Sequence, residues 1–138
     1  MAFNAKDIKL LWGKAASRCS MSDCRRPLVE KANDLPSTVI VGEMAHIVGE
    51  KPSKKSPRGL SSLPVAERNR YPNLILLCAH HHNLIDKNEK EWSIEKLHSI
   101  KREHELWVEE QLREQVDEEL QIYHNDNLNK SDNETDKK

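Results

Sequence analysis

The chain has 138 residues, of which 33% are charged and 4% are aromatic. This length predicts one compact domain, and this composition predicts a small apolar core that needs additional stabilisation. No apolar run approaches the roughly 20 residues of a membrane span, no N-terminal signal region is visible, and three cysteines cannot all pair as disulfides. We therefore expect a reduced, cytoplasmic protein with no membrane association.

The formal net charge of -1 hides an uneven distribution of charge along the chain. Residues 109–138 contain ten acidic and four basic residues, so this segment carries about -6 and the rest about +5. Residues 51–70 account for that surplus, with six basic residues and one acidic residue. A polyanion is expected to contact this basic segment first.

An amphipathic helix is predicted near the N-terminus, over residues 5–16. Ile8, Leu11 and Trp12 recur at helical spacing, and Asn4 precedes them as a candidate N-cap. We expect this helix to cover the core and Trp12 to be a packing residue.

Two cysteine-containing segments predict a zinc site assembled from distant parts of the chain. Cys19 and Cys24 form a C-x4-C pair, and Cys78 and His81 form a C-x2-H pair. A Cys3His set is a common tetrahedral zinc site, although Cys78 paired with His80 or with His82 is an alternative that the spacing leaves open.

A strand is predicted over residues 37–48, because β-branched residues precede His46 there. Residues 49–72 contain four prolines, two glycines and the basic cluster, which predicts a long loop that contacts phosphate. The apolar run of residues 74–77 then predicts a core strand, and residues 78–86 predict the start of a helix that carries three consecutive histidines.

A long helix is predicted to begin near Ser93 and to continue to about Tyr123 with one apolar face. His98 and His104 lie on it, and we interpret both as structural residues. Residues 124–138 are polar and acidic and predict a disordered tail. The expected organisation is an N-terminal helix over residues 1–18, a zinc-stapled core over residues 19–92, a C-terminal helix over residues 93–123, and the tail.

These motifs together resemble the HNH endonucleases, which have the ββα-metal fold. The resemblance covers roughly residues 6–112 and depends on GEMAHIV, the arginine-bearing loop and NLILLCAHHHNLID, with LLWGKAASRCSMSDC before them. It implies an α+β fold: a small zinc-stapled ββα core with an N-terminal helix and a long C-terminal helix. The implied activity is hydrolysis of phosphodiester bonds in DNA. Members of the family are often joined to sensing or regulatory domains, either in defence against mobile DNA or in mobile elements themselves.

The resemblance also assigns roles to individual residues. His46 would be the general base, Asn73 would hold the loop behind it through hydrogen bonds to backbone, and His82 would bind a catalytic Mg2+ or Mn2+ ion. Cys19, Cys24, Cys78 and His81 would form a structural zinc site, since four protein ligands leave no open position.

One position departs from the family pattern. Many members have an Asp or His as a second metal ligand immediately before the strand histidine, where this chain has Ala45. Glu43 could replace that ligand from the same strand face, and Asp86 could orient the ring of His82.

Several basic residues of the loop are predicted to bind the DNA backbone without reading sequence, because Arg and Lys contact phosphate. They are Lys54, Lys55, Arg58, Arg68 and Arg70. The C-terminal helix could form a homodimer or bind a regulatory subunit. The alternative to a nuclease is a non-catalytic zinc-stapled module that binds nucleic acid or a partner protein.

Overall fold

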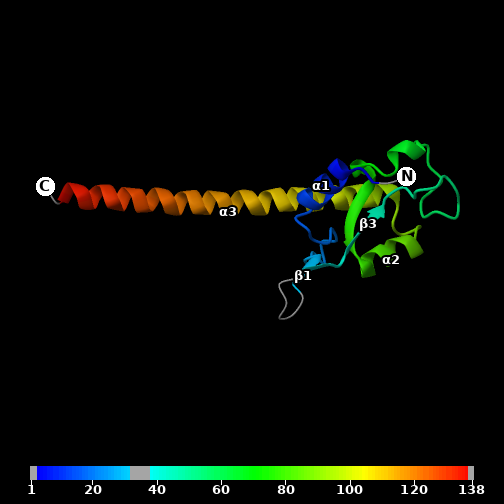
Figure 1. Ribbon diagram of the computed structural model, residues 1–138, viewed down its shortest axis with the longest axis horizontal. Coiled ribbons are helices and arrows are strands. Elements are labelled where there is room, and N and C mark those ends of the chain that lie inside the picture. Colours follow the sequence, from blue (N-terminus) through cyan, green and yellow to red (C-terminus); the bar gives the residue numbers. More distant parts are fainter. Residues whose placement is uncertain (1–2, 32–37, 137–138) are drawn as a thin grey trace. The chain divides into compact units, whose positions relative to one another are not determined.

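The computed structural model describes residues 3–31 and 38–136, except for the side chains of residues 114–116 and 129–136. The chain divides into two units, one up to Leu106 and one from Trp107 onward. The first unit combines helices with two small sheets, which confirms the predicted α+β class. Its elements, shown in Figure 1, are α1 (Ala5–Lys14), β1 (Val29–Lys31), β2 (Thr38–Ile40), β3 (Gly42–His46), β4 (Leu74–Cys78), α2 (Ala79–Lys87) and the first part of α3 (Ile94–Asp136).

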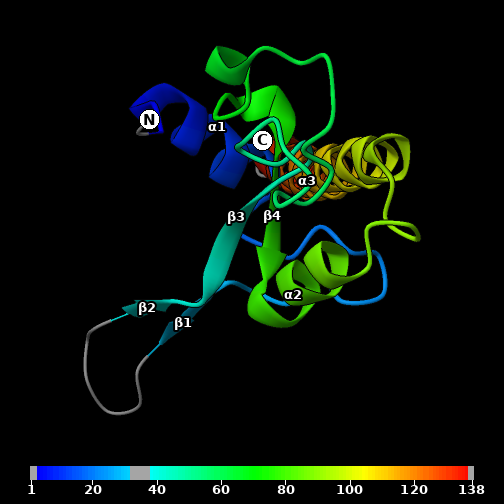
Figure 2. The ribbon, with the colours of Figure 1, turned by 90° about the vertical axis from the view of Figure 1, so that its right-hand side faces the viewer.

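The core of the first unit is the antiparallel pair of β3 and β4. Gly42 lies opposite Cys78, and His46 lies opposite Leu74. Every residue of β4 is buried, as the apolar run predicts, and burying each of its leucines contributes about 1.5–3 kcal/mol. α1 contacts β4, while α2 contacts both strands, and Figure 2 shows α2 alongside the pair. The order of β3, β4 and α2 therefore delivers the chain from the core directly into the three histidines.

α1 forms where the sequence predicts a helix. The side chain of Asn4 accepts a hydrogen bond from the backbone N–H of Lys6 at 2.8 Å, which satisfies one of the unpaired donors of the first turn. Leu11 is buried in the core, and Trp12 packs against it. The interpretation of Trp12 as a packing residue is confirmed.

The single strand expected over residues 37–48 is wrong. Residue 37 lies outside the described residues, and the remainder forms two strands in different sheets, because β2 pairs with β1 and β3 pairs with β4. The change of partner occurs at Val41, whose N–H donates to the carbonyl of Leu28 at 2.8 Å. Gly42 follows, where a Cβ atom would lie only 2.8 Å from the Leu28 side chain, so only glycine fits this crossing without displacement.

The predicted loop between β3 and β4 is largely irregular but is built around a buried arginine. Arg68 is 1% exposed, and its guanidinium donates to the carbonyls of Leu63, Gly49, Gly59 and Ser61 at 2.8–3.0 Å. These contacts occupy the donors that the sequence assigned to phosphate. The prediction that Arg68 binds DNA is therefore wrong, and its role is to hold the loop together.

Replacing Arg68 with alanine is expected to destabilise the protein by about 3 kcal/mol, because four backbone carbonyls, two of them in buried bonds, lose a charged donor. Lysine is expected to rescue little of this loss, since an ammonium group cannot reproduce the planar array of donors. Urea denaturation of both variants measures the effect, with Lys54→Ala as the control from the exposed part of the same loop. Equal midpoints for Arg68→Ala and Lys54→Ala would contradict the structural role.

α3 begins at Ile94, and Ser93 caps it by accepting a hydrogen bond from the Lys96 N–H at 3.2 Å. The helix continues to Asp136 and thus includes residues 124–136, where the composition predicts disorder. This segment contains neither proline nor glycine, so no residue in it interrupts a helix. Among the described residues, no helix is long and apolar enough to cross a membrane.

The second unit, taken by itself, exposes large apolar side chains along α3. Leu112, Leu120, Tyr123 and Leu128 are each more than half exposed. Pairing with a second copy or a regulatory subunit through this helix stays a prediction.

His104 is a structural residue, as predicted, since it is fully buried and its Nε2 lies 3.0 Å from the carbonyl of Ala15. Burial lowers the pKa of His104 below its ordinary value, so the folded protein favours the neutral ring. The resulting stabilisation is present above pH ~6.5 and is lost as the pH falls through the folded-state pKa.

We accordingly expect His104→Gln, which keeps a donor for Ala15, to lose less stability than the wild type between pH 7.5 and pH 5. Urea midpoints of both proteins at the two pH values measure this difference. Any titration of the cysteine and histidine cluster is common to both proteins and cancels in the comparison. An identical loss in both proteins would show that His104 makes no contribution to the acid sensitivity.

Candidate metal and catalytic sites

The C-x4-C segment is folded into a tight knuckle by its own backbone. The N–H of Cys19 donates to the carbonyl of Arg26, and the N–H groups of Cys24 and Arg25 both donate to the carbonyl of Met21, at 3.0 Å in each case. The N–H of Ser20 donates to the carbonyl of Leu76 in β4, also at 3.0 Å. This last bond fixes the knuckle to the strand that ends in Cys78.

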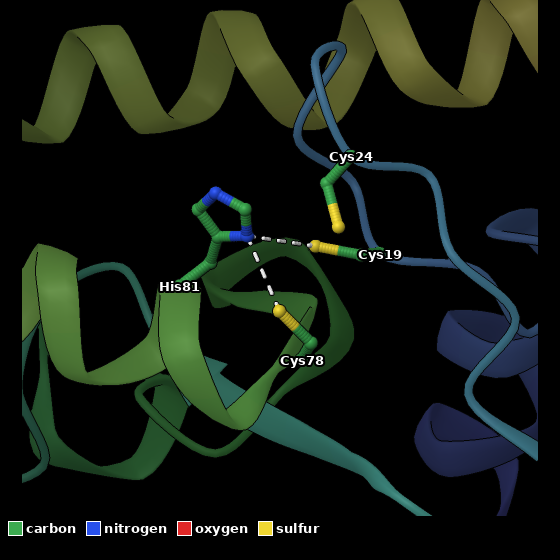
Figure 3. Close-up of side chains that lie close together, drawn as sticks. All are labelled: Cys19, Cys24, Cys78 and His81. Carbon is green, nitrogen blue, oxygen red and sulfur yellow. Dashed lines mark hydrogen bonds between the residues drawn. The ribbon is translucent and has the colours of Figure 1, made fainter.

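The four predicted zinc ligands converge at this point. One ligand atom from each of Cys19, Cys24, Cys78 and His81 lies within 4.8 Å of the others. The Nδ1 atom of His81 is 3.6 Å from the sulfur of Cys19 and 3.2 Å from the sulfur of Cys78, as Figure 3 shows. Sulfur and nitrogen ligands of one tetrahedral zinc ion would be about 3.6 Å apart, given zinc–ligand bonds of roughly 2.0–2.3 Å. The group is therefore close enough to hold a metal ion.

Burial affects the two kinds of ligand in this group differently. Burial raises the pKa of the Cys19 thiol to about 12. Such a buried thiol becomes a thiolate when a metal ion supplies the compensating charge. Burial lowers the pKa of His81, which favours the neutral imidazole that a metal ion requires.

Helix geometry separates the three histidines of α2. Cys78 is the N-cap, and His81, three residues later, lies nearly one turn on and faces back toward it, whereas successive residues such as His80, His81 and His82 are rotated by about 100° from one another. His80 is exposed and packs edge-on against the ring of His81, with ring centroids 5.0 Å apart. The histidine of the four-ligand group is therefore His81, and not His80 or His82, which the spacing had left open.

His82 belongs to a second group, which also includes Glu43 and Asp86. Its Nδ1 lies 2.7 Å from a carboxylate oxygen of Glu43 on β3, and its Nε2 lies 3.1 Å from a carboxylate oxygen of Asp86. The hydrogen bond to Asp86, aided by Glu43, raises the pKa of His82 despite partial burial. The side chain of Glu43 is 49% exposed and that of His82 is 29% exposed, so solvent reaches this group.

Arg58 holds Asp86 in place. Its guanidinium donates to Asp86 at 2.8 Å and to the backbone carbonyls of His46, Ile47 and Ile85. Burial acts to raise the pKa of Asp86, but the hydrogen bonds from His82 and Arg58 outweigh it and lower the pKa. Arg58 is 8% exposed, so the prediction that it binds DNA is wrong. It links the end of β3 to α2.

His46 is the last residue of β3 and has different neighbours from His82. Its Nε2 lies 2.6 Å from Oδ1 of Asn69, and the ring of Phe3 stacks on its ring with centroids 5.7 Å apart. Successive residues of a strand point to opposite faces, so His46 and Glu43 leave β3 on opposite sides.

Asn73 makes the backbone contacts that its predicted role requires. Its Oδ1 accepts from the N–H of Val48 at 2.9 Å, and its Nδ2 donates to the carbonyls of Val48 and Arg68 at 2.8 Å. Asn73 is buried, and these bonds hold the two ends of the long loop against each other behind His46.

The remaining predicted DNA contacts differ in their accessibility. Lys54 and Lys55 are exposed on the loop. Arg70 is half exposed and forms an ion pair at 2.8 Å with Asp7, which is buried on α1. Of the five cations that the sequence assigns to DNA, these three have side chains that solvent reaches.

Asn69 and Phe3 were missed by the sequence analysis, although both contact His46. Nothing in their spacing marks them, because Asn69 lies within the loop and Phe3 precedes the first helix. The chain matches no protein-family model and no curated protein. The functional assignment therefore depends on the residues and on their geometry.

Proposed function

We propose that this protein is a metal-dependent endonuclease that hydrolyses phosphodiester bonds in DNA, as HNH endonucleases do. The observation that carries the proposal is that two adjacent histidines belong to two different groups of side chains. His81 joins three cysteines in a group with no open position, while His82 is partly exposed between two carboxylates beside the strand that ends in His46. A structural site and a reactive site are both supported.

The Cys3His group is proposed to bind zinc. Three sulfur atoms and one imidazole are ligands that select zinc over harder cations. Such a site fixes the knuckle to the junction of β4 and α2, and its role is structural.

The residues around His82 fit a catalytic divalent ion such as Mg2+ or Mn2+. Glu43 and the Nδ1 atom of His82 would hold the ion, and Asp86 would accept the proton of Nε2 and so fix the ring as a ligand. Glu43 thereby replaces the ligand that the family has at position 45, where Ala45 is fully buried. When bound, the ion supplies positive charge to the scissile phosphate.

His46 is proposed to act as the general base. It removes a proton from a water molecule, whose oxygen then forms a bond to phosphorus. The bond between phosphorus and the 3′ oxygen breaks, and that oxygen takes its electron pair and a proton from solvent. Asn73 supports this step by holding the loop behind the strand end.

Conversion of supercoiled plasmid to nicked plasmid by the zinc-loaded chain tests the proposal. We expect nicking with Mg2+ or Mn2+ and none without a divalent ion. Glu43→Gln and His82→Ala should raise the metal concentration needed, while zinc content stays unchanged. Nicking that is insensitive to both substitutions would remove the catalytic ion from this group.

The second candidate is a non-catalytic zinc-stapled binding module. The observation that favours it is the mutual pairing of His82 with Glu43 and Asp86, in which each ring nitrogen lies beside a carboxylate oxygen. This module would bind nucleic acid through exposed cations such as Lys54 and Lys55 but leave plasmid intact under all metal conditions.

A further inference from the structure

The loop between β3 and β4 places one amide side chain against the ring of His46. Asn69 is 6% exposed, and its Oδ1 lies 2.6 Å from Nε2 of His46. Because an amide oxygen can only accept, the ring nitrogen that faces it must carry the proton. A neutral imidazole has one protonated nitrogen, so Nδ1 of His46 then has the free lone pair.

The position of Asn69 is fixed on both sides along the chain. Its neighbour Arg68 is held by four backbone carbonyls, and the carbonyl of Arg68 in turn accepts from Asn73. On the other side, Arg70 is paired with Asp7 of α1. The backbone at Asn69 is therefore held between two anchored arginines.

A second contact fixes the ring of His46 itself. Phe3 stacks on it with an angle of 30° between the ring planes. Phe3 directly precedes Asn4, the N-cap of α1, and packs against the core. The imidazole is thus held by one hydrogen bond at Nε2 and by one aromatic face, and the edge that carries Nδ1 takes part in neither contact.

We propose that Asn69 is a positioning residue that fixes His46 as the Nε2–H tautomer, with Nδ1 as the atom that takes the proton from water. This inference rests on the proposed function, because a base is needed only if the chain cleaves phosphodiesters. Beyond the proposed function, the inference specifies which ring nitrogen of His46 accepts the proton and which side chain determines the tautomer. The chemistry resembles that of other oriented imidazoles, where a wrong tautomer lowers the rate although the ring is present.

The test compares Asn69→Ala with Asn69→Asp. Aspartate keeps an acceptor oxygen at the same place, so it should retain the wild-type tautomer, whereas alanine should not. The ring nitrogen chemical shifts of His46, recorded by NMR above pH 7.5 on the zinc-loaded chain, report the tautomer directly. We expect the wild type and Asn69→Asp to show protonated Nε2, and Asn69→Ala to show a mixture.

Plasmid nicking by the same three proteins measures the consequence. Asn69→Ala should lower the rate constant at saturating plasmid by about 10- to 100-fold, with Asn69→Asp recovering most of it. Zinc content and the backbone NMR spectrum establish that each variant is folded. If the Asn69→Ala protein does not fold, Asn69→Ser replaces it as the variant with a small side chain.

Different results overturn different parts of this reasoning. An Asn69→Ala protein with the wild-type tautomer, or an Asn69→Asp protein no better than alanine, overturns the role of Asn69 even if the wild type is a nuclease. A chain that nicks no plasmid but shows the expected tautomer shift removes the proposed function, and it overturns the catalytic meaning of the contact.

Discussion

Cys78→Ser is expected to abolish binding of the proposed zinc ion and to unfold the first unit. Cys78 is 4% exposed at the junction between β4 and α2, and its sulfur lies 3.2 Å from Nδ1 of His81 within the Cys and His group. Binding of structural zinc contributes about 10–16 kcal/mol in small zinc domains, which is comparable to the whole stability of a protein, about 5–15 kcal/mol. Loss of one ligand therefore removes a large part of the folding free energy.

Metal analysis and thermal unfolding measured by circular dichroism check this expectation. The purified wild type should contain one zinc ion per chain, and a strong chelator should lower its thermal midpoint by more than 15 °C. His81→Ala should behave like Cys78→Ser, while His82→Ala should retain zinc and unfold close to the wild type. If His82→Ala rather than His81→Ala released zinc, the assignment of the two histidines would be reversed.

His46→Ala is expected to lower plasmid nicking by about 10²- to 10⁴-fold, the range that general base catalysis contributes. The substitution removes the ring that Asn69 and Phe3 hold at the end of β3 and leaves the cysteine cluster untouched. Nicking rates at saturating Mg2+ or Mn2+ provide the measurement.

His98→Ala is the matched control for that substitution, because His98 lies on α3 and has no predicted catalytic role. It should nick at the wild-type rate. Zinc content should be the same in all three proteins. Undiminished nicking by a folded His46→Ala protein would exclude His46 as the base.

The sequence predicts well those features that depend on neighbouring residues. The apolar run of β4, the Asn4 cap of α1 and the start of α3 at Ser93 follow from local patterns, and the structure agrees with them. The cysteine and histidine group was predictable for a different reason. Its ligand types are rare, and a helical turn after Cys78 leaves one histidine in reach.

Features that depend on contacts between distant segments could not be predicted. The break at Val41 requires knowledge of the carbonyl of Leu28, and the change of sheet follows from it. Arg58 and Arg68 occur in a loop rich in proline and serine, where arginine normally remains in solvent, so their burial has no local signal. Asn69 is one polar residue among many until the fold brings it to His46.

The loop between β3 and β4 closes around the guanidinium group of its own Arg68. Several of its carbonyl oxygens accept hydrogen bonds from the Arg68 guanidinium. Position 59 requires glycine, because a Cβ atom there would lie 2.5 Å from the carbonyl oxygen of Ser53. Shortening or lengthening this segment therefore has unequal effects. Insertions beside Lys54 and Lys55 lengthen an exposed part of the loop. A deletion between Gly59 and Leu63 instead removes a carbonyl that accepts from Arg68 and leaves part of the buried guanidinium without a partner.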